Sequence, residues 1–77
     1  MSLQTTEAET QAAVRQIINN KRCRRAGRAL RAFRGGEDAD EADFRDLLAN
    51  LMHYASKNGY DFDREMATAR RNYEAEI

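Results

Sequence analysis

Apolar residues recur at intervals of three and four along most of this chain, and no stretch alternates between apolar and polar residues as a strand would. Such spacing places apolar side chains on one face of a helix. The clearest example is a stripe formed by Phe44, Leu47, Leu48, Leu51, Met52 and Ala55. None of the 77 residues is a proline that would break a helix. The sequence therefore predicts an all-α fold.

The second half of the chain predicts a helical hairpin over residues 41–76. Asp40 is a candidate N-cap for the first of its helices, and Asn58–Gly59 is a pair that commonly ends a helix. Asp61 can cap the second helix. The apolar stripe of that helix is spaced by four, three and four residues and consists of Phe62, Met66, Ala69 and Tyr73.

The first half, residues 5–34, carries two apolar stripes. Thr6 followed by Glu9 is a capping-box pattern that predicts the start of a helix. On a continuous helix, the first stripe (Val14, Ile17 and Ile18) points away from the second (Cys23, Ala26, Leu30 and Phe33). Either the helix breaks at Asn19–Asn20, or one long helix buries a different face at each end. We expect the long helix, ended by Gly35–Gly36.

The chain as a whole predicts one small domain, residues 1–77, with a glycine-rich and acidic loop over residues 35–40. A chain of this length buries too little surface for two separate cores. Small domains often gain stability by oligomerising, so we expect a homo-oligomer with Val14, Ile17 and Ile18 at its interface. The single cysteine, Cys23, excludes an internal disulfide and suits the reducing cytoplasm. No apolar run is long enough to predict a membrane span.

Five cations share about a third of the circumference of the expected long helix: Lys21, Arg24, Arg25, Arg28 and Arg31. They are either the polar face of an amphipathic helix or a surface for phosphates, as in nucleic-acid binding. The acidic segment from Glu37 to Asp46 follows, and the chain has 13 cations and 13 anions. We therefore expect these cations to contact protein, with the acidic segment as their counterpart, rather than nucleic acid.

A row of polar residues on the first hairpin helix follows a spacing of three, four and three: Asp43, Asp46, Asn50 and His53. Asp43 and Asp46 are candidate ligands for Mg²⁺, which prefers carboxylate oxygens. The alternative is a solvated helix face that holds no metal. His53 has no serine or cysteine nucleophile that the sequence places beside it, so no catalytic residue and no cofactor are assigned.

The stretch "DFRDLLANLMHYASKNGYDFDREMATARRNYEAEI", residues 43–77, resembles the C-terminal half of MazG-like all-α nucleotide pyrophosphohydrolases. The resemblance implies that Asp43 and Asp46 correspond to the family's second acidic pair, which binds Mg²⁺ with a first pair from another helix. That first pair is not matched, since Glu7 has Thr10 three residues on and Glu9 has Ala12. The chain is also similar to short uncharacterised bacterial and phage proteins that share the pattern DLL…LMHY…G.DFD…YEAE.

Three functions follow from these patterns. We favour a non-catalytic cytoplasmic protein that self-associates and binds another protein, as a phage or mobile-element factor would. The first alternative is a Mg²⁺-dependent nucleoside triphosphate pyrophosphohydrolase whose site is assembled across a dimer. The second alternative is a nucleic-acid-binding protein that uses the arginine-rich helix.

Overall fold

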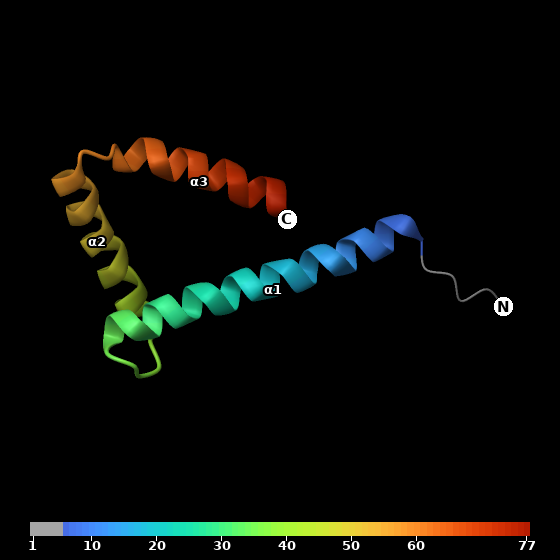
Figure 1. Cartoon of the computed structure of the whole chain (residues 1–77), viewed down its shortest axis with the longest axis horizontal. Coiled ribbons are helices and arrows are strands. Elements are labelled where there is room, and N and C mark those ends of the chain that lie inside the picture. Colours follow the sequence, from blue (N-terminus) through green and yellow to red (C-terminus); the bar gives the residue numbers. More distant parts are fainter. Residues whose placement is uncertain (1–5) are drawn as a thin grey trace.

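The fold consists of three α-helices, as a computed structural model that describes residues 6–77 shows (Figure 1). Helix α1 spans Glu7–Arg34, α2 spans Glu41–Asn58 and α3 spans Phe62–Glu76. The described part of the chain contains no strand, so the all-α prediction is confirmed. Helix α1 runs through Asn19–Asn20 without a break, as expected. The part of the domain assignment that concerns residues 1–5 lies outside the described residues.

Helix α1 begins and ends where its sequence predicts. The hydroxyl of Thr6 accepts a hydrogen bond from the backbone N–H of Glu9 at 3.1 Å, which satisfies one of the free donors of the first turn. At the other end Gly35 adopts a φ of 96°, a left-handed conformation that glycine takes without a steric penalty. The N–H of Gly36 then donates to the carbonyl of Arg31 at 2.8 Å and closes the helix end.

Capping residues also determine where α2 begins and ends and where α3 begins. Asp40 and Asp43 form a capping box, in which each carboxylate accepts the backbone N–H of the other residue, at 3.0 and 2.9 Å. Gly59, with a φ of 75°, ends α2. The carboxylate of Asp61 accepts the N–H of Arg64 at 3.1 Å and starts α3. Only three residues, 59–61, therefore separate α2 from α3.

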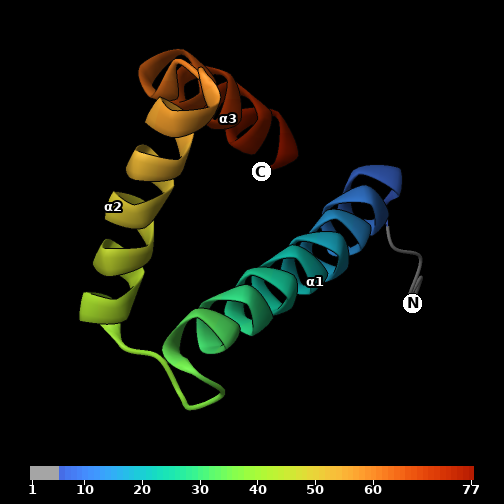
Figure 2. The same cartoon turned by 60° about the vertical axis from the view of Figure 1, so that its left-hand side comes forward.

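The three helices form an open frame rather than a closed bundle. The end of α1 lies beside the start of α2, and α3 runs from the far end of α2 back toward the middle of α1 (Figures 1 and 2). The frame is closed by polar contacts. The amide of Asn19 donates to the backbone carbonyl of Glu76 at 2.8 Å, and Arg22 lies 3.5 Å from the Glu76 carboxylate.

Very little of the protein is buried within this frame. Ala55 of α2, 5% exposed, is the only buried residue among residues 6–77. The half-buried residues that surround the α1–α2 corner and the α2–α3 turn include Leu30, Leu47, Leu48 and Phe62. Most large apolar side chains of all three helices are exposed. The Cα radius of gyration is 17.2 Å, against about 11 Å for a compact chain of this length.

No helix between residues 6 and 77 has an apolar stretch that would reach across a lipid bilayer.

Candidate functional site

The face of α1 that points away from α2 and α3 carries the first apolar stripe. Val14, Ile17 and Ile18 lie there with 49%, 56% and 42% of their surface exposed. The opposite face bears Asn19, which contacts α3. Because moving apolar side chains out of water lowers the free energy, these three residues form a surface that another helix can cover.

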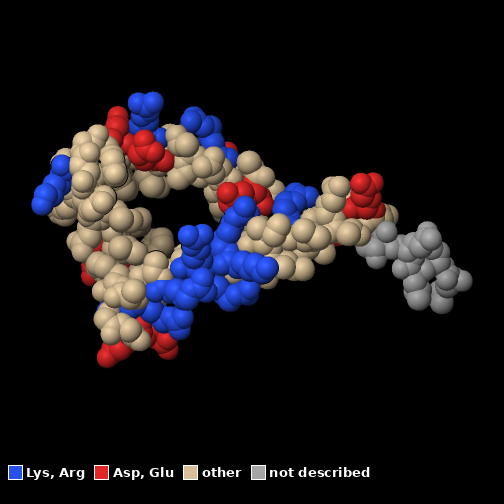
Figure 3. Space-filling view, in the orientation of Figure 1, with Lys and Arg blue, Asp and Glu red and all other residues tan. Residues whose placement is uncertain are grey.

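The same outer face becomes basic in the second half of α1. At 100° per residue, the five predicted cations continue along the side of the helix that carries the first apolar stripe. All five are exposed, and none forms an ion pair within residues 6–77. We call this set the basic patch; it consists of Lys21, Arg24, Arg25, Arg28 and Arg31. Figure 3 shows Lys and Arg side chains gathered over this part of α1.

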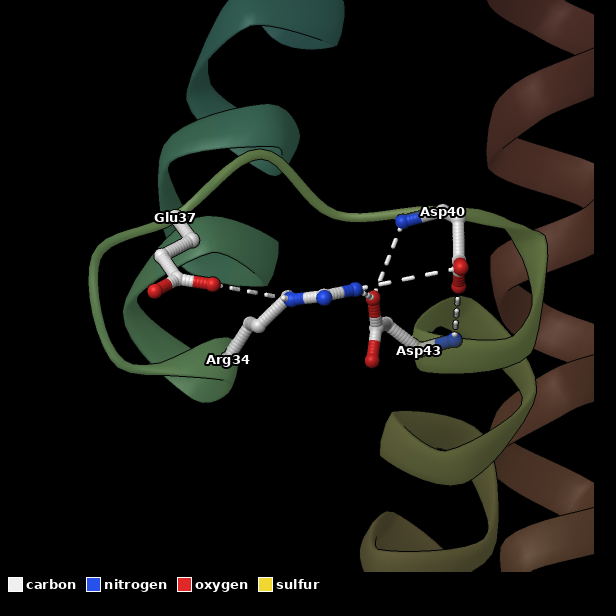
Figure 4. A network of polar contacts seen from close by, with 4 residues as sticks. All are labelled: Arg34, Glu37, Asp40 and Asp43. Atoms are coloured by element: carbon white, nitrogen blue, oxygen red, sulfur yellow. Dashed lines mark hydrogen bonds and ion pairs between the residues drawn. The ribbon is translucent and has the colours of Figure 1, made fainter.

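The acidic segment after α1 forms ion pairs with Arg34, the last residue of that helix (Figure 4). The Arg34 guanidinium lies 3.7 Å from the Glu37 carboxylate and 3.8 Å from that of Asp40, and it donates a hydrogen bond to Asp43. Arg34 therefore ties the end of α1 to the start of α2. Within residues 6–77, no other cation of the run 21–34 forms an ion pair with the segment that the sequence suggested as its counterpart. Arg24, Arg28 and Arg31 nevertheless line one hollow together with Asp38 of that segment.

The contacts around Arg34 shift the pKa values of two of the residues involved. The pKa of Asp43 is lowered because its carboxylate accepts the backbone N–H of Asp40 and then the Arg34 hydrogen bond, both of which favour the charged form. The pKa of Arg34 is raised, mainly by its hydrogen bond to Asp43. Both side chains are therefore held in their charged forms at neutral pH.

The suggested metal site is not assembled by the described helices. Asp43 is half-buried and its Oδ2 is already bound by the Asp40 N–H and by Arg34. Asp46, Asn50 and His53 are exposed along α2. Within residues 6–77, no three His, Cys, Asp or Glu side chains come close enough together to hold a metal ion. Any Mg²⁺ at Asp46 would need ligands from another chain or a substrate.

A contact that the sequence did not indicate joins α3 to α1. Besides the bonds from Asn19 and Arg22, Arg15 donates to the backbone carbonyl of Ile77 at 3.4 Å. Asn19 and Arg15 satisfy backbone carbonyls at the end of α3, where a helix carries partial negative charge, whereas Arg22 pairs with the side-chain carboxylate of Glu76. A hollow of about 450 Å³ lies beside the contact. It is lined by Asn19, Arg22, Cys23, Tyr73, Glu76 and Ile77. The sequence did not predict this contact, because the polar residues of α1 that make it follow no pattern that distinguishes them from solvent-exposed residues.

No protein-family model, curated protein or solved structure matches this chain.

Proposed function

We propose that the protein is a non-catalytic helical module that self-associates and, once assembled, binds another protein. One observation carries the proposal: the helices present their apolar faces to solvent, with Ala55 alone buried among residues 6–77. Exposed apolar side chains occur on α1, α2 and α3 alike, for example Ile17, Leu51 and Tyr73. Apolar surface of this extent marks a protein interface.

The size of the exposed surface supports a second copy of the chain as the first partner. The accessible surface is 6963 Å² for a mass of 8.8 kDa, whereas a compact monomer of this mass exposes about 4,800 Å². The excess is on the order of 2,000 Å², which is comparable with the area that obligate homodimers bury. Self-association would therefore give the chain the burial that a single copy lacks.

The acidic residues support a non-catalytic role. A triphosphate hydrolase of the kind that residues 43–77 resemble would use Asp43 as a free carboxylate for Mg²⁺. Here the Asp43 carboxylate completes the capping box of α2 and binds Arg34, so its charge helps to join two helices. The resemblance to short bacterial and phage proteins supports a host protein as the partner that we propose, and the lone Cys23 supports a cytoplasmic location for the proposed module.

Light scattering at micromolar concentration tests this proposal directly. We expect at least a dimer, and we expect Leu51→Asp to weaken association because Leu51 is exposed in a single copy and would be covered in the oligomer. Asn50→Asp is the matched control, since it adds the same charge one residue away on the polar side of α2. A monomeric wild-type protein with full helical circular dichroism would contradict self-association.

A further inference from the structure

The outer face of α1 has a regular composition along its length. Positions spaced by three and four residues form one stripe over residues 7–28, about 32 Å long. We call it the outer stripe; it consists of Glu7, Thr10, Gln11, Val14, Ile17, Ile18, Lys21, Arg24, Arg25 and Arg28. Its first turn is acidic, its middle is apolar and its last two turns are basic. All of these residues are exposed.

We infer that α1 pairs antiparallel with α1 of a second copy through the outer stripe, an inference that rests on the proposed self-association. A two-fold axis near Val14, Ile17 and Ile18 would bring the apolar residues of both copies together. Spacing by three and four residues is the pattern with which two helices interlock side chains along a shared seam, at an interaxial distance of about 8–10 Å. The seam requires an unbroken α1 over this length, which the structure has.

Charge complementarity selects the antiparallel direction. With the axis at the apolar residues, Glu7 of each copy lies opposite the stretch from Arg24 to Arg28 of the other. A symmetric pair makes this contact twice. A parallel pair would instead place Arg24, Arg25 and Arg28 against the same cations of the second copy, and like charges in that arrangement repel.

The pairing also supplies partners for cations that form no ion pair within residues 6–77. Arg34 pairs with acids of the segment that follows α1, whereas Arg24 and Arg28 form no ion pair within residues 6–77 and only line a hollow beside Asp38. Among the residues that the structure describes, Glu7 accepts one side-chain hydrogen bond, from Gln11 of its own helix at 3.5 Å, and forms no ion pair. The charges of the outer stripe are therefore available to a second α1. Lys21 can extend its aliphatic stem along the apolar centre while its ammonium stays in water.

A charge-reversal cycle on the full chain tests the pairing. Glu7→Lys and the double variant Arg24→Glu/Arg28→Glu should each raise the dimer dissociation constant about tenfold at low salt, since each replaces two attractive contacts by repulsive ones. All three changes combined should restore association to within about threefold of the wild type. Raising the salt concentration should shrink these differences, because exposed charges are screened.

Glu9→Lys is the matched control. Glu9 also lies in the first turn of α1, where a cation opposes the helix dipole, but on the side away from the outer stripe. It should lower helix content as much as Glu7→Lys does and leave the dissociation constant unchanged. A stable oligomer that is insensitive to Glu7→Lys, or that the combined variant fails to restore, would overturn the antiparallel pairing and leave self-association intact. A monomeric wild-type protein would overturn both.

Discussion

Truncation of Ile17 is the most direct measure of what the outer stripe contributes to association. Full burial of an isoleucine side chain stabilises a folded or associated protein by about 1.5–3 kcal/mol. Ile17 is 56% exposed in a single copy, so roughly half of that free energy remains for the second copy to supply. Ile17→Ala keeps the Cβ, and the loss is therefore about 1 kcal/mol per copy. In a symmetric dimer the loss occurs twice, so the dissociation constant should rise about 30-fold.

The substitution should not weaken α1 itself. Alanine has a higher helix propensity than isoleucine, and residue 17 lies far from both ends of the helix. The dissociation constant is measured by sedimentation equilibrium over a dilution series, with helix content followed by circular dichroism. Gln16→Ala is the control, because Gln16 lies next in sequence on the side of α1 that faces α3. A change of less than about threefold for Ile17→Ala would refute burial of Ile17 in the dimer.

Three further predictions concern charge. Because the pKa of Asp43 is lowered, its contribution to stability is complete above its ordinary pKa of 3.8 and is lost as the pH falls through the lower folded value. In urea unfolding below pH 4, the free energy of unfolding of Asp43→Asn should therefore fall less steeply with pH than that of the wild type. Pyrophosphate release from nucleoside triphosphates with Mg²⁺ or Mn²⁺ should be negligible, and turnover abolished by Asp46→Asn would contradict the non-catalytic role. Duplex DNA and RNA should bind weakly near physiological salt, whereas tight, salt-sensitive binding lost on changing Arg24, Arg25 and Arg28 to glutamine would identify a nucleic-acid surface.

The sequence by itself determined where the helices begin and end. Thr6, Asp40 and Asp61 each cap a helix through hydrogen bonds to the backbone three residues on, and Gly59 ends α2 in a left-handed conformation. These contacts span a few residues, so local chemistry is enough to predict them. The apolar periodicity likewise identified the faces of the helices without reference to any distant residue.

The tertiary structure alone decided which face meets which partner. Periodicity shows that a face is apolar and gives no information on what covers it, so the open frame could not be predicted. Several cations could have paired with the acidic segment. Arg34 does so because the loop after α1 folds back and brings Glu37 and Asp40 close to the end of that helix. The contact of Asn19 with Glu76 joins residues 57 apart in sequence. Such contacts depend on how the helices are placed in space, which cannot be predicted from local periodicity or capping residues.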